Sequence, residues 1–218
     1  CPVCQWRRSK MWQARFFSAL PRLVDEYPKS RWLFLTLTVP NPEVTDLSAM
    51  LSDMNKAWQR FIKRKEFKPV EGWIRSTEIT QEKANPTRAH PHFHVLMMVP
   101  QSMLSGRNYV TRDTWLKVWR DCMRDQSITQ VDIRAVRPKK GAKEALTLKE
   151  YLRGIVTETL KYSVKERDLK TDKTFFLEMM RQLHKKRLIA SGGALKNILK
   201  PERETNEDLV GADGETLE

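Results

Sequence analysis

The sequence predicts an α+β fold, in which a central antiparallel sheet carries helices on its faces. Two runs with the alternation and composition of strands, residues 72–80 and 90–99, are separated only by the short loop 81–89. Strands joined so closely pair as an antiparallel hairpin. Longer stretches with helical periodicity lie between the other strands, and such helices cover the faces of a sheet. With 218 residues, the chain can form one domain with a buried core.

The first part of the chain alternates helix and strand signals. Residues 6–26 have a helical pattern that ends before Pro28, and residues 31–39 are rich in strand-forming types up to a pair of prolines. Residues 46–65 then repeat apolar residues at helical spacing behind Thr45, a residue type that often caps helices. The hairpin follows this second helix.

The second part is predicted to add three helices and a fourth strand. Thr147 and Glu150 have the spacing of a capping box, and a glycine-rich stretch from Ser191 follows the last helical pattern. The segments are expected as a helix at 111–123, a strand at 128–136, a basic linker at 138–146, a helix at 147–164 and a helix at 172–189.

Charge is distributed unevenly along the chain. The formal net charge is +13, but residues 201–218 contain five Glu, two Asp and one Arg and so carry −6. The preceding 200 residues therefore carry +19, which favours a polyanionic partner, most often nucleic acid. The acidic end is expected to be a disordered tail. Because no apolar run could span a bilayer and no signal peptide pattern is present, we expect a cytoplasmic protein without a membrane partner.

The three cysteines favour a reducing compartment over a disulfide framework. Cys1 and Cys4 form a Cys-x-x-Cys, half of a zinc ribbon, within an N-terminal segment of residues 1–30. Because the chain starts at Cys1 rather than Met, it is expected to be a fragment. Zn²⁺ would bind at this pair only if further ligands lie upstream.

Three of the four histidines lie on one face of one predicted strand. Side chains alternate across a strand, so His90, His92 and His94 point to one side and the apolar residues between them to the other. Imidazoles that converge in this way can hold a divalent metal. Ordinary surface or core histidines are the alternative interpretation.

The neighbouring strand supplies a carboxylate and a candidate DNA contact. The hairpin brings Glu78 toward the histidine face, and two imidazoles with one carboxylate suit Mn²⁺ or Mg²⁺ with positions left for phosphate oxygens. A solvated edge carboxylate is the alternative for Glu78. His90 ranks below His92 and His94 as a ligand. Arg75 is a candidate DNA contact in the same strand, as is Trp73, although tryptophans are more often core residues.

The helix predicted over 147–164 supplies Glu158 and Tyr162, which are four residues apart and share a face. They lie at the margin of the apolar stripe, where a side chain can face a cleft. Lys161 and Lys165 lie on the polar side and could contact DNA phosphates. A tyrosine hydroxyl becomes a good nucleophile when a metal polarises the phosphorus it attacks. Taken alone, such a Glu and Tyr pair is also common on helix surfaces.

Three segments in order resemble the motifs of the plasmid rolling-circle replication initiators (Rep proteins) of the HUH endonuclease superfamily. They are Phe-Leu-Thr-Leu-Thr-Val-Pro-Asn at 34–41, His-Pro-His-Phe-His-Val-Leu at 90–96 and Glu-Thr-Leu-Lys-Tyr-Ser-Val-Lys at 158–165. The opening Cys-Pro-Val-Cys-Gln-Trp-Arg-Arg also resembles the start of that family's replication domain. The resemblance implies an HUH endonuclease domain over 31–200, with an RRM-like sheet that carries the histidine strand.

The resemblance also implies a role for each motif residue. His92, His94 and Glu78 would hold the metal, and Tyr162 would nick one DNA strand and keep the 5′ phosphate. The freed 3′ hydroxyl then primes synthesis. In the single-tyrosine subgroup with a Glu four residues before the Tyr, that Glu activates water to end the cycle, and Glu158 fits this position. The implied partners are single-stranded plasmid origin DNA and a host helicase and polymerase.

Other functions share parts of this pattern. Relaxases and transposases use the same metal motif. The His-x-His-x-His run is also similar to the histidine-triad nucleotide hydrolases, in which a histidine attacks phosphate without a metal, although those chains need neither the basic charge nor the tyrosine helix. A non-enzymatic DNA-binding module with structural zinc is a further alternative, but it leaves the Glu158 and Tyr162 pair unexplained.

Overall fold

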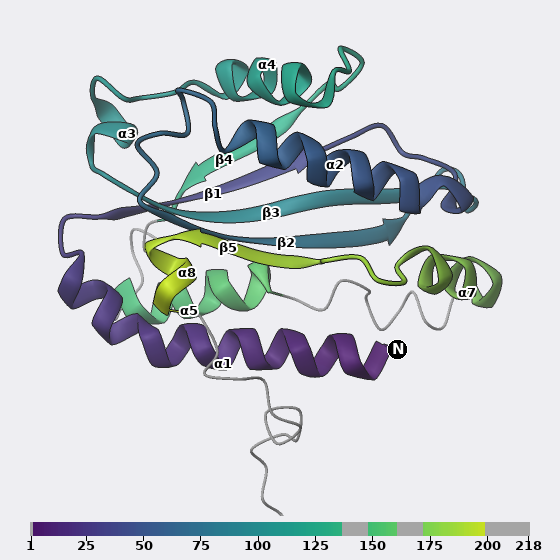
Figure 1. Ribbon diagram of the computed structural model, residues 1–218, viewed down its shortest axis with the longest axis horizontal. Helices are drawn as coiled ribbons and strands as arrows, with labels where there is room; N and C mark the ends of the chain where they lie inside the picture. The colour runs from purple at the N-terminus through teal and green to yellow at the C-terminus, as the bar shows by residue number, and fades with distance from the viewer. Residues whose placement is uncertain (1, 137–147, 161–171, 199–218) are drawn as a thin grey trace, which may run out of the picture.

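The computed structural model of the protein describes residues 2–136, 148–160 and 172–198. Five strands form one antiparallel sheet in the order β4-β1-β3-β2-β5 (Figure 1). The strands are β1 (Arg31–Thr38), β2 (Gly72–Gln81), β3 (Ala89–Val99), β4 (Val131–Ala135) and β5 (Ile189–Gly193). The histidine strand is β3, at the centre of the sheet, so the predicted α+β class is confirmed.

Helices cover both faces of this sheet. Helices α2 and α4 lie on one face, and α1, α5 and α8 lie on the other (Figure 1). The helices are α1 (Pro2–Glu26), the short 3₁₀ helix η1 (Val44–Asp46), α2 (Leu47–Phe61), α3 (Ser102–Ser105), α4 (Arg112–Met123), α5 (Leu148–Thr159), α7 (Lys173–Gln182) and α8 (Ala194–Ile198). None of them, within the described residues, combines the length and apolar character needed to cross a bilayer.

Two apolar clusters hold the layers together, one on each face of the sheet. The larger packs α2 and α4 against the odd-numbered residues of β3, including Phe93 and Val95. The smaller packs α1 and α5 against even-numbered residues such as Ile74 and Leu96. Because α1 contributes Phe16 and its neighbours to this second cluster, it packs directly on the sheet, and the domain boundary predicted at residue 30 stays a prediction.

The prediction of a helix over 172–189 was wrong at its C-terminal end. Helix α7 ends at Gln182, and β5 then pairs with β2, with Gly192 opposite Trp73. A Cβ atom at Gly192 would lie 2.4–2.5 Å from three atoms of the Trp73 ring, so only glycine allows this close approach. Gly193 has a φ of +59°, a value that L residues rarely adopt. Glycine-rich edge strands carry little strand signal, which is why β5 was missed.

Other boundaries differ in smaller ways. The helix expected from residue 46 starts at Leu47, behind η1, and its N-cap is Asp46 without a side-chain hydrogen bond, so the prediction that Thr45 caps it was wrong. Thr111 caps α4 by accepting a hydrogen bond from the backbone N–H of Thr114. The linker 138–146, Thr147 and the acidic tail lie outside the described residues.

Candidate metal centre

The three predicted metal ligands converge at one end of the β2–β3 hairpin. The register of the two strands pairs Glu78 with His92 and Ser76 with His94. As a result, Oε2 of Glu78 lies 3.1 Å from Nε2 of His92 and 2.8 Å from Nε2 of His94. One ligand atom from each residue lies within 4.8 Å of the others. These distances are short enough for one ion to contact all three side chains.

Glu78, His92 and His94, called the metal group from here on, lie mostly out of solvent. The side chains of His92, Glu78 and His94 are 11%, 12% and 14% exposed. The His94 ring stacks on Phe34, with 5.3 Å between ring centroids. A partly dry site strengthens the attraction between a cation and a carboxylate, so the surroundings favour metal binding.

Hydrogen bonds on the far side of each imidazole direct its Nε2 atom toward Glu78. Nδ1 of His92 lies 3.3 Å from the backbone carbonyl oxygen of His90, and Nδ1 of His94 lies 3.3 Å from Oγ1 of Thr36. Such outer contacts fix the ring orientation and the tautomer of histidines that bind metals. In the sequence Thr36 is only one residue of a motif, and its place opposite His94 on β1 gives it this further role.

The tautomer of His92 tests whether a cation fits. A carbonyl oxygen can only accept, so Nδ1 of His92 carries the hydrogen that it donates to His90. In the neutral ring, Nε2 then has a lone pair, and that lone pair faces the carboxylate oxygen of Glu78 across 3.1 Å. Two electron-rich atoms at this distance repel unless a proton or a cation lies between them. The donor set therefore fits a divalent ion such as Mn²⁺ or Mg²⁺.

His90 lies beside this group but is not part of it. Its Nδ1 atom lies 2.7 Å from Oδ1 of Asn41, and its ring centroid is 5.0 Å from that of His92. Burial lowers the pKa of His90, and the neighbouring His92 lowers it further. A neutral His90 that donates to Asn41 is held in place next to the metal group.

Arg75 lies on the opposite face of the sheet from the histidines. It is 1% exposed, its guanidinium lies 4.0 Å from the centroid of the Phe93 ring, and one nitrogen donates to Oδ1 of Asn55 on α2. Burial lowers the pKa of Arg75 to about 9. These surroundings fit a structural role better than the predicted DNA contact. Trp73 packs in the same core, 4.9 Å from Trp58 between ring centroids.

The end of α5 is anchored beside the metal group. The carbonyl oxygen of Thr159 accepts a hydrogen bond from the hydroxyl of Ser76, the residue opposite His94. The carbonyl oxygen of Leu160 accepts from Ser9 and Gln13 of α1. These contacts hold the last turn of α5 between α1 and the sheet. Tyr162, Lys161 and Lys165, together with the side chain of Glu158, lie outside the described residues.

Of the N-terminal cysteine pair, the structure describes only Cys4, which does not belong to the metal group. Cys4 is exposed in the first turn of α1, and Cys1 lies outside the described residues. Among the residues that the structure describes, only Glu78, His92 and His94 form a group of three metal-ligating side chains. Zinc at the cysteine pair stays a prediction.

Comparison with known proteins identifies the family of the chain. A family of replication proteins, Rep_1, matches residues 1–218. A curated relative called "Protein rep" from Streptococcus pneumoniae serotype 2 is 34% identical over 204 residues, which cover 92% of this chain and 61% of the relative. A second, from Lactiplantibacillus plantarum, is 33% identical over 221 residues, covering 96% and 68%.

The chain thus spans roughly three fifths to two thirds of the length of these two relatives. No solved structure matches it. The family match covers the metal group, the anchored end of α5 and the histidine strand alike. The chain belongs to the Rep_1 family of replication proteins.

Proposed function

We propose that this protein is a plasmid rolling-circle replication initiator that nicks and rejoins single-stranded origin DNA. The convergence of Glu78, His92 and His94 in a chain from a replication protein family is the observation that carries the proposal. When bound there, a divalent cation would stabilise the charge that develops on the scissile phosphate oxygens. The three side chains hold the ion and leave its remaining positions for those oxygens.

Tyr162 is the proposed nucleophile. Its hydroxyl oxygen, having lost its proton, attacks phosphorus, and the bond from phosphorus to the 3′ oxygen breaks. The protein keeps the 5′ phosphate on Tyr162, and the leaving oxygen takes a proton to become a 3′ hydroxyl. The hydrogen bond from Ser76 to the carbonyl oxygen of Thr159 supports this role, because Thr159 comes only three residues before Tyr162 in the sequence and Ser76 lies opposite His94.

Glu158 is the proposed base for the end of the reaction. It precedes Tyr162 by one helical turn in the sequence. A carboxylate in that position can take a proton from water, which then attacks a phosphotyrosine bond and releases the DNA. Tyr162 alone would complete only strand transfer, so Glu158 provides the step that stops replication.

The basic charge of the chain supports DNA binding in the same reaction. The +19 charge of the first 200 residues attracts the phosphate backbone, and Lys161 and Lys165 are the proposed contacts nearest the nucleophile. The 3′ hydroxyl would then serve a host polymerase, with a host helicase to open the duplex. Relaxases and transposases share this chemistry, but the replication protein family favours initiation of replication.

The proposal is tested by the covalent intermediate. The protein is incubated with Mn²⁺ and a labelled single-stranded oligonucleotide from the plasmid origin, and adducts are separated on a denaturing gel. We expect an adduct that is lost in Tyr162→Phe and kept in the matched control Tyr151→Phe, which changes a tyrosine within α5. Glu158→Ala should still nick but release the DNA slowly.

Two outcomes would contradict the proposal. An adduct that persists in Tyr162→Phe would assign the nucleophile to another residue. Cleavage that continues after chelation of all metal would favour the histidine-triad chemistry instead.

A further inference from the structure

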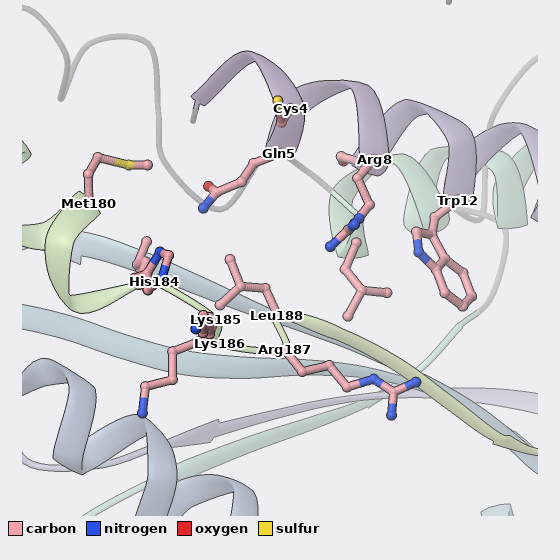
Figure 2. Close-up of a pocket in the computed structure, with 13 residues that line it drawn as sticks. Cys4, Gln5, Arg8, Trp12, Met180, His184, Lys185, Lys186, Arg187 and Leu188 are labelled. Atoms are coloured by element: carbon pink, nitrogen blue, oxygen red, sulfur yellow. The ribbon is translucent and has the colours of Figure 1, made fainter. Parts of the chain in front are cut away.

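A second polar site lies on the same face of the sheet as the metal group. It is a pocket of about 500 Å³ between the N-terminal half of α1 and the segment that links α7 to β5. Figure 2 shows Arg8 and Trp12 extending from α1 toward the segment that carries His184, Leu188 and Arg187. Its volume lies within the range of small-ligand pockets, about 300–1,000 Å³. We call it the basic pocket.

Positive charge dominates the basic pocket. Arg8, Lys185 and Arg187 line it together with His184, and none of the described residues that line it is an Asp or Glu. All four of these side chains are solvent-exposed. Lys186 also lines the pocket, but its Nζ atom donates to Oγ of Ser52 on α2. Within the part of the chain that the structure describes, Arg8 and Arg187 have no acidic partner, and such guanidinium groups are suited to bind phosphate oxygens.

The basic pocket also has an aromatic and apolar part. Trp12 is half-buried, and Leu188 and Ile189 also line the pocket. A flat aromatic ring beside phosphate-binding cations is the combination that single-stranded nucleic acid uses, because the ring stacks on a base while the cations neutralise the backbone. A site for an isolated inorganic anion needs no such ring.

The basic pocket lies close to the metal group. Ile189 of the pocket pairs with Ser76, and Ser76 pairs with His94. With neighbouring strands about 4.8 Å apart, the Cα atoms of Ile189 and His94 lie on the order of 10 Å apart. Ser9, another lining residue, is bonded to the last turn of α5. A DNA strand that reaches the metal group therefore has a short path to the pocket.

We propose that the basic pocket binds a nucleotide of single-stranded DNA next to the phosphate that is cut. Arg8 and Arg187 bind its phosphate group, and Trp12 stacks on its base. The inference rests on the proposed nicking function for the identity of the strand. It goes beyond that function because it assigns a DNA site to α1 and to the segment after α7, apart from the metal ligands and from Tyr162.

Binding is measured without cleavage. In a Tyr162→Phe background with EDTA, fluorescence anisotropy follows a labelled oligonucleotide of about 16 nucleotides. The double variant Arg8→Ala, Arg187→Ala is compared with Arg112→Ala, Lys117→Ala, which removes the same charge from exposed positions on α4, at the opposite face of the sheet. Thermal unfolding checks that all variants are folded.

The pocket variant should bind at least about tenfold more weakly. The slope of its log affinity against log salt should become shallower by about 0.7, the value for one neutralised phosphate of a single strand. The α4 variant should lose less than about twofold, because exposed charges on the far face are screened. Trp12→Leu should weaken binding about fivefold without a change in the salt dependence, and Trp12→Phe should restore most of the affinity.

Equal losses in the pocket and α4 variants would overturn the proposal, because the pocket would then act only through the overall charge. So would displacement of the oligonucleotide by thymidine monophosphate at equal phosphate concentration, which would indicate a site for free nucleotides. The covalent adduct assay is scored separately. If the wild type forms no adduct but the pocket variants bind DNA more weakly, only the proposed function is refuted. If the wild type forms the adduct but the pocket variants bind DNA as well as their parent does, only the pocket proposal is refuted.

Discussion

The two faces of β3 differ although they belong to one strand. On the odd-numbered face, Phe93, Val95 and Met97 are fully buried beneath α2 and α4. On the even-numbered face, Leu96 is buried beneath α1 and α5, but His92 and His94 form the metal group with Glu78. The residues of one face therefore all belong to the core, whereas the other face carries core residues along one part and the metal group along another.

This difference shows how one strand of a small domain can join a rigid core to a candidate metal site. The apolar face holds the strand in place, and the strand in turn sets the spacing of the imidazoles on its other side. A side chain that is fixed by packing behind it can present its ligand atom with little loss of conformational entropy on metal binding. The two faces should thus respond differently to substitution.

The largest effect is expected from a metal ligand. His94→Gln keeps the size of the side chain but removes the imidazole, and it should weaken Mn²⁺ binding at least about 100-fold in calorimetric titration. In the wild type, Mn²⁺ at about 100 times its dissociation constant should raise the free energy of unfolding by about 2.7 kcal/mol, and in the variant this gain should disappear.

The matched substitution on the other face of β3 is Phe93→Leu. It should lower the free energy of unfolding by about 1.5 kcal/mol and leave Mn²⁺ affinity within about twofold of wild type. If Phe93→Leu weakened metal binding as much as His94→Gln, the two faces would not be functionally separate.

The next effect concerns the edge strand β5. Gly192→Ala should lower the free energy of unfolding by about 1–3 kcal/mol in urea denaturation, because the new methyl group overlaps the Trp73 ring. The control is Gly154→Ala on α5, where nothing lies within 4 Å of the added Cβ, and this change should stabilise the protein by about 0.5–1 kcal/mol. Equal stabilities for the two variants would show that β5 does not need the glycine.

A smaller effect is expected from the outer contact of His94. Thr36→Val removes the hydroxyl near Nδ1 of His94 and should weaken Mn²⁺ binding about tenfold, with the fold unchanged by circular dichroism. Thr38→Val is the control, since the Thr38 hydroxyl on the same strand donates to the carbonyl oxygen of Gln130 instead. A loss that is the same in both variants would mean that Thr36 does not orient the imidazole.

The smallest effect is expected from Arg75. Arg75→Met keeps most of the packing against Phe93, so the free energy of unfolding at pH 7 should change by less than about 1.5 kcal/mol and the salt dependence of DNA binding should not change. A reduced salt dependence would instead support the original prediction of a DNA contact.

The same variant also tests the pKa of Arg75. Burial lowers that pKa to about 9 from its usual 12.5, so above pH 9 the unfolded chain holds more protons at this residue than the folded one. The contribution of Arg75 to stability is therefore least favourable below pH 9 and improves as the pH rises. As the pH rises from 8 to 10, the free energy of unfolding of the wild type, measured by denaturation, should therefore increase relative to that of Arg75→Met.

Local patterns were enough to predict the histidine strand, the hairpin and the two-sided sheet. The alternation of His92, Phe93 and His94 sets which side chains share a face, and this period does not depend on the rest of the chain. The same period puts Arg75 on the other face of the strand from Glu78, although Arg75 was predicted to contact DNA. Its burial came from the docking of α2, which no local pattern reveals.

Other features depended on residues far apart in the chain. β5 forms because Gly192 and Gly193 fit against Trp73 and Glu71, and a short glycine-rich stretch carries no such information by itself. The basic pocket joins Arg8 to Arg187, from near the two ends of the described chain. Neither the pairing nor the pocket has a signature in sequence spacing.

The sequence by itself determined four of the five strands and most helices, the face of each of those strands and the residue types that can bind a metal, because periodicity and composition are properties of neighbouring residues. Only the tertiary structure decided which of those residues meet. The register of β2 on β3 brought Oε2 of Glu78 between two Nε2 atoms, and the packing of α1 against α5 set the last turn of α5 beside them. Contacts between distant segments depend on how whole layers pack, and that is a property of the folded chain.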